Sequence, residues 1–183
     1  MAEYYLNSQL PSLDGIGEST PLPITEERFL DLCRQFLKKK TFEKIEKITL
    51  VPSLDFEKAG SDLLTEWNKR ERDLRLALAR ARAEKLGKSF EYKSESVREA
   101  LSRAVSAAVE IENPLEAENF LLHYRLDFLE ELRPMDVFSE AYLFYYALKL
   151  KLILRIRRFD RELGEAAYKN IYSSILNGER LEA

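Results

Sequence analysis

Apolar residues recur along most of the chain at the three- and four-residue spacing that is typical of helices with one buried face. The first such helix is predicted after Thr25, whose side chain can cap it, and the lysines at 38–40 should close its negative end. A short helix is predicted from the apolar positions within 42–48, and Pro52 should end it.

A long helix is predicted from Ser61 or Asp62 to Gly87, a residue type suited to the left-handed C-cap. Its main apolar seam consists of Leu64, Trp67, Leu74, Leu78 and Ala81. A second, weaker stripe consists of Leu76, Ala79 and Ala83.

The next helix is predicted from the capping-box spacing of Ser96 and Glu99. Its apolar face consists of Val97, Leu101, Ala104, Val105 and Ala108. Another helix should begin at Asn113, an N-cap residue followed by proline, and end at Arg133-Pro134.

Ser139 opens a segment that is apolar on nearly all sides of a helix, which predicts a central helix buried around most of its circumference. Residues 148–156 also alternate like a strand, but the segment continues without a turn signal, which favours a helix. A last helix is predicted over 161–176, ended by Asn177-Gly178.

These elements predict an all-α, single-domain helical bundle of about six or seven helices. Residues 1–24 hold three of the six prolines and two of the six glycines, so they are expected to be a mostly irregular N-terminal segment. Residues 25–183 form the predicted helical body, and no segment offers a convincing partner strand.

Composition indicates an ordered, soluble protein, since 45% of the residues are hydrophobic and 33% are charged. The net charge of −3 argues against a dedicated nucleic-acid binder. The chain shows no signal peptide and no apolar run suited to a membrane span, which predicts a cytoplasmic location. A peripheral position at the cytoplasmic face of the inner membrane, through partners only, remains open.

Residues suited to catalytic chemistry are few. There is no glycine-rich phosphate loop, and one cysteine with one histidine excludes disulfides and most zinc and di-metal sites. Cys33 and His123 form the one conceivable nucleophile–base pair, but Cys33 is expected on a buried apolar face. We therefore predict a protein that is not an enzyme, with no catalytic, cofactor-binding or metal-binding residues and no small-molecule substrate.

Charge is unevenly distributed. Residues 1–31 carry one basic and six acidic side chains. In contrast, residues 69–88 carry eight basic and three acidic side chains, and residues 149–161 carry six basic side chains and one acidic side chain. Either basic cluster can be a solvated, ion-paired helix face, a docking surface for an acidic partner, or a nucleic-acid contact. Tyr142, Phe144, Tyr145 and Tyr146 are expected in the core, although tyrosine is also common at interfaces.

Several segments, in order along most of the chain, resemble a family of bacterial proteins encoded with V/A-type (vacuolar-type) ATPase subunits. They are Tyr4-Tyr5-Leu6 followed by Leu10-Pro11-Ser12-Leu13, Phe29-Leu30-Asp31-Leu32-Cys33, Trp67-Asn68-Lys69-Arg70-Glu71, Leu74-Arg75 with Leu78-Ala79-Arg80-Ala81-Arg82, Asn113-Pro114-Leu115-Glu116-Ala117-Glu118, and Ala141 through Lys149-Leu150 to Arg155, Asp160 and Gly164.

The resemblance implies similarity to the central-stalk adaptor of rotary ATPases, a helical protein between the rotating shaft and the membrane ring that has no active site. It implies a non-catalytic coupling subunit or accessory factor of the ATPase, with the shaft and the proteolipid ring as partners. This chain is shorter than a full central-stalk adaptor, which has three similar helical units. The alternative is a helical protein- or nucleic-acid-binding module that uses the basic helix 69–88.

Overall fold

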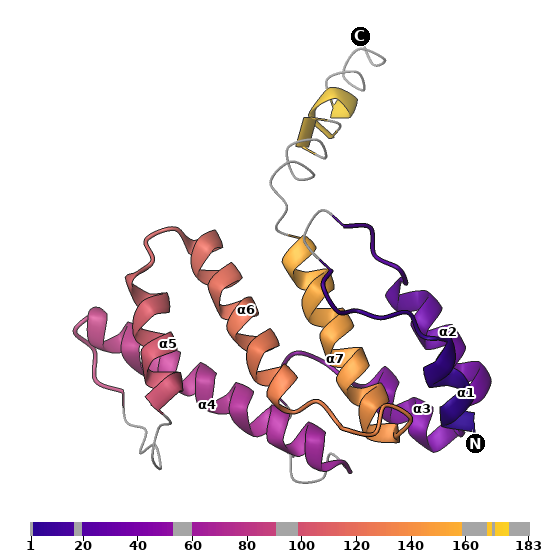
Figure 1. Cartoon of the computed structure of the whole chain (residues 1–183). Helices are drawn as coiled ribbons and strands as arrows, with labels where there is room; N and C mark the ends of the chain where they lie inside the picture. The colour runs from indigo at the N-terminus through magenta and orange to yellow at the C-terminus, as the bar shows by residue number, and fades with distance from the viewer. Residues whose placement is uncertain are drawn as a thin grey trace.

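The computed structural model describes residues 2–16, 20–52, 60–90, 99–158, 168–169 and 171–175. These residues contain helices and no strand, so the all-α prediction is confirmed for the described part of the chain. The main helices are α1 (Ala2–Gln9), α2 (Glu26–Phe36), α3 (Lys39–Glu46), α4 (Asp62–Lys85), α5 (Glu99–Glu110), α6 (Pro114–Glu131) and α7 (Glu140–Arg157) (Figure 1).

Several predicted helix ends are confirmed by hydrogen bonds. The side chains of Thr25 and Ser139 accept bonds from backbone N–H groups three residues later, as N-caps do. Asn113 caps α6 ahead of Pro114 through a bond from the N–H of Leu115. Gly87 has φ +65°, and its N–H donates to the carbonyl of Glu84, which is the expected left-handed end of α4.

Two expectations at the N-terminal side were wrong in detail. Residues 2–9 form α1, although the prediction placed them in the irregular segment; residues 10–16 and 20–25 are indeed irregular. Helix α2 ends at Phe36, so Lys39 and Lys40 begin α3 instead of closing α2. The proline-based reasoning missed α1 because Pro11 follows it, and a proline after a helix is compatible with that helix.

Some predictions fall outside the described residues. These are the helix start at Ser96 with Val97, and most of the last helix over 161–176. Residues 168–169 and 171–175 are described and are helical.

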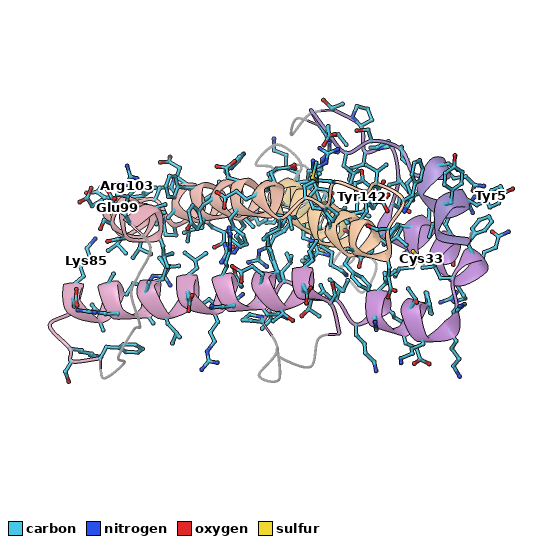
Figure 2. The ribbon with its side chains drawn as sticks, turned by 60° about the horizontal axis from the view of Figure 1, so that its bottom comes forward. Tyr5, Cys33, Lys85, Glu99, Arg103 and Tyr142 are labelled. Carbon is cyan, nitrogen blue, oxygen red and sulfur yellow. The ribbon has the colours of Figure 1, made fainter. Side chains whose placement is uncertain are left out.

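The helices form two layers, and α1 and α2 cover one end of them. Helices α3 and α4 lie along one side, and α6 and α7 lie across from them (Figure 2). Helix α5 packs against both α4 and α6, whereas α1 and α2 close the opposite end beside α3 and α7. Helix α7 contacts α3, α4 and α6, which makes it the central helix that the sequence predicted.

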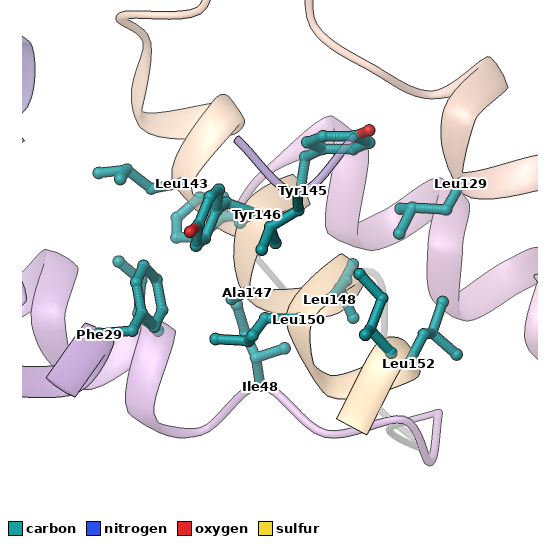
Figure 3. Close-up of a cluster of buried hydrophobic side chains, with 14 of the residues drawn as sticks. Phe29, Ile48, Leu129, Leu143, Tyr145, Tyr146, Ala147, Leu148, Leu150 and Leu152 are labelled. Carbon is teal, nitrogen blue, oxygen red and sulfur yellow. The ribbon is translucent and has the colours of Figure 1, made fainter. Parts of the chain in front are cut away.

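The described residues contain two separate hydrophobic cores. The first core surrounds α7 and includes Phe29, Ile48 and Leu129 from three other parts of the chain (Figure 3). Trp67 of α4 belongs to it as well. Residues 143–150 of α7 are all buried, which confirms burial around most of that helix. The second core is small and joins α4, α5 and α6. It consists of Leu74, Leu78, Leu101, Val105, Ala108 and Leu121.

Candidate interaction surfaces

Cys33 and His123, the one conceivable nucleophile–base pair, lie in different environments. Cys33 is fully buried in the first core, and burial raises the pKa of its thiol to about 12. His123 is exposed on α6, where its Nδ1 lies 2.8 Å from the carbonyl oxygen of Asn119. The thiol is thus held in its protonated form, away from solvent, which disfavours nucleophilic chemistry at this position.

The described residues offer neither a metal centre nor a membrane span. No group of three or more histidine, cysteine, aspartate or glutamate side chains there is arranged to hold a metal ion. In the same part of the chain, no helix combines the length and apolar character that crossing a bilayer requires.

A buried ion pair connects α4 to α6 near the border of the two cores. Glu71 is fully buried, and Arg125 donates to it twice, with Nε–Oε2 and Nη2–Oε1 distances of 2.8 and 3.1 Å. Arg75 donates a third bond of 2.7 Å from the solvent side. Glu71 counts among the three acidic residues of 69–88, and the sequence did not predict its burial. A signal was present, since Glu71 has the seam spacing between Trp67 and Leu74.

A second polar cluster fixes the N-terminal segment to α7. The Lys149 Nζ is 2.5 Å from Asp14 Oδ1 and 2.6 Å from Glu130 Oε1. Tyr145 donates a 2.7 Å bond to Glu130, and the hydroxyl of Tyr146 donates a 3.0 Å bond to the carbonyl of Pro11. The aromatic cluster of α7 is therefore part of the core, as expected, with its hydroxyls directed to specific partners.

The electrostatics of this cluster favour the charged forms of Asp14 and Lys149 and the neutral form of Tyr145. The hydrogen bond from Lys149, outweighing partial burial, lowers the pKa of Asp14. Burial opposes the charge on Lys149, but its bonds to Asp14, Glu130 and Tyr145 outweigh burial and raise its pKa above the ordinary value. Burial also raises the pKa of Tyr145. These groups serve to hold elements together.

The basic residues of 149–158 also bond largely within the protein. Lys151 pairs with Glu26, Arg155 bonds to Glu118 at 2.9 Å, and Arg157 donates to the carbonyl of Thr20. Together with the Lys149–Asp14 pair, these bonds join the acidic first 31 residues and α6 to the basic α7. The ion pairs of Lys149, Lys151 and Arg155 favour the ion-paired interpretation of this cluster.

The basic residues of 69–88 show a similar pattern. Arg70 bonds to Glu66 and Glu131 at 3.1 and 2.6 Å, and Arg80 bonds to Glu84 at 2.8 Å. Lys85 donates a 2.8 Å bond to the carbonyl of Val109. These bonds reduce the cationic surface available to a nucleic acid and favour the interpretation of a solvated, ion-paired helix face.

An open basic cleft of about 210 Å³ lies beside the end of α7. Its charged lining consists of Lys151, Arg155, Arg158 and Glu26, and its apolar lining includes Leu50 and Leu154. Arg158 is exposed, and its guanidinium has no hydrogen-bond or ion-pair partner among the described residues. We call this feature the basic cleft.

Exposed aromatic and aliphatic side chains lie on α1 and on the loop between α6 and α7, and these two segments contact each other. Tyr4 stacks on Phe138 with ring centroids 4.4 Å apart, and Asn7 donates to the carbonyl of Ser139. Tyr5, 60% exposed, lies at the outer end of the molecule in Figure 2. We call the exposed set the aromatic patch: Tyr4, Tyr5, Met135, Val137 and Phe138.

Comparison of the chain with protein-family models, with curated proteins and with solved structures finds no match.

Proposed function

We propose that this protein is a non-catalytic helical adaptor that docks other proteins, and that its complex is a bacterial V/A-type rotary ATPase. The observation that supports an adaptor is the contrast between its reactive side chains, which are held inside the protein, and its exposed apolar side chains. Cys33 is held in the core and Lys149 in internal ion pairs, so neither side chain is available for catalysis. In contrast, the large apolar side chains of the aromatic patch are exposed on the surface.

The assignment to a rotary ATPase rests on the sequence resemblance. An adaptor between a shaft and a membrane ring has to transmit torque, which requires elements that do not slide past one another. Bonds between elements that are distant in sequence suit this requirement, among them Lys149–Asp14 and Arg125–Glu71. The bonds of Arg155 to Glu118 and of Arg157 to the carbonyl of Thr20 also join elements that are distant in sequence.

Affinity purification of the tagged protein from its native host in mild detergent tests the proposal. We expect mass spectrometry to find the catalytic, shaft and proteolipid subunits of the ATPase in the eluate. Recovery of salt-sensitive nucleic acid or ribosomes would instead support the basic helix 69–88 as the functional surface. Recovery of neither would overturn the ATPase assignment.

Two variants in the aromatic patch and one matched control variant outside it test the role of the patch in the same experiment. Tyr5→Glu and Met135→Glu place a charge in the patch at positions too exposed to support the core. Leu86→Glu places the same charge on an exposed leucine at the end of α4. We expect the first two variants to lose the ATPase subunits and the third to retain them. Equal recovery in all three would exclude the aromatic patch as the interface.

A further inference from the structure

The basic cleft has the composition of a site for an acidic, partly apolar ligand. Lys151 and Arg155 of α7 and Arg158, the residue that follows this helix, recur at four- and three-residue spacing, so all three cations line the same opening. Glu26 at the start of α2 is the one carboxylate in the lining. The lining therefore has a formal charge of +2, although the whole chain has a net charge of −3.

The three cations differ in how far they are already neutralised. Lys151 is paired with Glu26, and Arg155 is bonded to Glu118. Arg158 follows the last residue of α7, and within the described residues its guanidinium makes no ion pair. A planar guanidinium with several N–H donors binds a carboxylate through two parallel bonds, so Arg158 is suited to receive one.

Part of the cleft wall is apolar. Residues 48–50, which follow α3, line it together with Leu154. Leu50 and Leu154 are half-buried and pack at the edge of the first core. Ile48, which also lines the cleft, is buried in the first core and points toward Ala147 and Leu150 of α7 (Figure 3). Apolar surface beside an incompletely neutralised arginine fits a ligand that carries both a charge and a hydrocarbon group.

We propose that the basic cleft docks an acidic segment of a partner protein. A carboxylate of that segment pairs with Arg158, and a neighbouring apolar side chain lies against Leu50 and Leu154. Pockets for whole small molecules usually enclose about 300–1,000 Å³, so about 210 Å³ suits one or two side chains of a peptide better. A free phosphate or a nucleic-acid backbone has no group for the apolar wall.

This inference rests on the proposed adaptor function and deepens it by naming the chemistry of one partner. Its test nevertheless uses the isolated full chain and no ATPase component. The cleft can therefore bind acidic peptides even if the ATPase assignment fails, and the two outcomes are distinguishable.

The experiment is a selection of random peptides displayed on phage against the purified full-length protein. We expect the enriched sequences to combine aspartate or glutamate with a nearby leucine, isoleucine or phenylalanine. Synthetic copies should bind in fluorescence anisotropy with an affinity that falls as salt rises, because the contact is partly electrostatic. Replacing the apolar residue of the peptide with serine tests the apolar wall without altering the protein.

Arg158→Glu tests the position of the site, and Arg103→Glu is its matched control. Arg103 is exposed on α5, its contact with Glu99 is a weak 3.9 Å pair, and α5 lies far from α2 in Figure 1. Both variants change the net charge equally, and neither side chain supports a core. We expect Arg158→Glu to weaken peptide binding about tenfold or more and Arg103→Glu to leave it nearly unchanged.

Three outcomes would overturn the proposal. One is a selection that enriches no acidic–apolar peptides. Another is an equal loss of binding in both charge-reversal variants, which would indicate diffuse electrostatic attraction. The third is displacement of the peptide by inorganic phosphate at concentrations near the dissociation constant of the peptide, which would indicate a simple anion site.

Discussion

The first core, around α7, and the second core, between α4, α5 and α6, are stabilised in different ways. The first is large, contains aromatic side chains and receives residues from α1, α2, α3, α4 and α6. The second is built from six leucine, valine and alanine side chains, and α5 has no part in the first core. Because burial of apolar area drives folding, the second core should open before the first.

The polar groups near each core differ as well. Glu71 and Arg125 are both buried, so each needs the other to compensate for lost hydration. Lys149 is also buried, but its partners Asp14 and Glu130 keep much of their side-chain surface in solvent, at 51% and 41%. A buried pair should therefore be more sensitive to the loss of one member than a pair with one exposed side.

The largest expected effect is that of Glu71→Ala. It leaves the guanidinium of Arg125 buried without a carboxylate, and we expect a loss of about 3–5 kcal/mol in the free energy of unfolding. Urea denaturation followed by circular dichroism measures this loss. Replacing both partners, Glu71→Leu with Arg125→Met, should restore most of the stability, because no buried charge remains.

The control for this experiment is Glu84→Ala on the same helix. Glu84 pairs with Arg80, but both side chains are more than half exposed, at 61% and 55%. We expect a change of at most about 0.5 kcal/mol. If Glu71→Ala costs no more than Glu84→Ala, the pair near the border of the cores is not buried in solution.

A pair of leucine truncations compares the two cores directly. Leu148→Ala removes a fully buried side chain from the centre of the first core, and we expect a loss of about 4 kcal/mol. Leu78→Ala in the second core should cost about 2 kcal/mol, because fewer elements surround it and the site can relax. Urea denaturation of the two variants measures both losses, and a larger loss for Leu78→Ala would contradict the ranking of the cores.

Hydrogen exchange sharpens the same comparison in the unmodified protein. We expect the amides of α5 to exchange faster than those of α7, and Leu78→Ala to increase the difference. Equal protection of both helices would show that the two cores unfold as one cooperative unit.

Lys149→Met should have a smaller effect, about 1–2 kcal/mol at neutral pH, because water can solvate the carboxylates that it leaves behind. It should also alter the pH dependence. The pKa of Asp14 is lowered in the folded protein, so its contribution is complete above its ordinary pKa of about 4 and is lost as the pH falls through the folded value.

Urea denaturation at about pH 7 and about pH 3 tests this expectation. The unmodified protein should lose more stability than Lys149→Met over that interval, since the variant lacks the favourable Lys149–Asp14 interaction. Parallel losses in the two proteins would mean that this pair contributes nothing to the acid response.

Apart from the control Glu84→Ala, the smallest effect is expected at the end of α4. Gly87 has φ +65°, and a Cβ atom added there meets nothing within 4 Å, so the cost of Gly87→Ala is that of the left-handed backbone alone. We expect about 1 kcal/mol. Gly87→Asn should cost less, because asparagine tolerates this conformation better, and thermal denaturation can rank the two. A larger cost for asparagine would contradict the proposed cause.

Helix positions were largely predictable because they depend on neighbours three and four residues away. The caps at Thr25, Asn113 and Ser139 and the buried circumference of α7 all follow from local spacing. Helix α1 and the start of α3 were missed because their local signals are weak. Lys39 and Lys40 are poor residues for a helix N-terminus, where the helix dipole disfavours positive charge.

The pairing of charges could not be predicted in the same way. The sequence showed an acidic N-terminal segment and a basic segment over 149–161, but not that they meet. The contacts of Asp14 with Lys149 and of Glu118 with Arg155 cross 135 and 37 residues. For the same reason the basic cleft, which combines residues from α2, the segment after α3 and α7, has no local signature.

The sequence by itself determined that the chain forms helices, where most of them begin and end, and which faces are apolar, because backbone geometry repeats over a few residues. Only the tertiary structure decided that there are two cores, that Glu71 is buried and that most of the basic residues of α7 are engaged inside the protein. Those outcomes depend on which helix faces meet, and that is set by packing and charge complementarity between residues far apart in the chain.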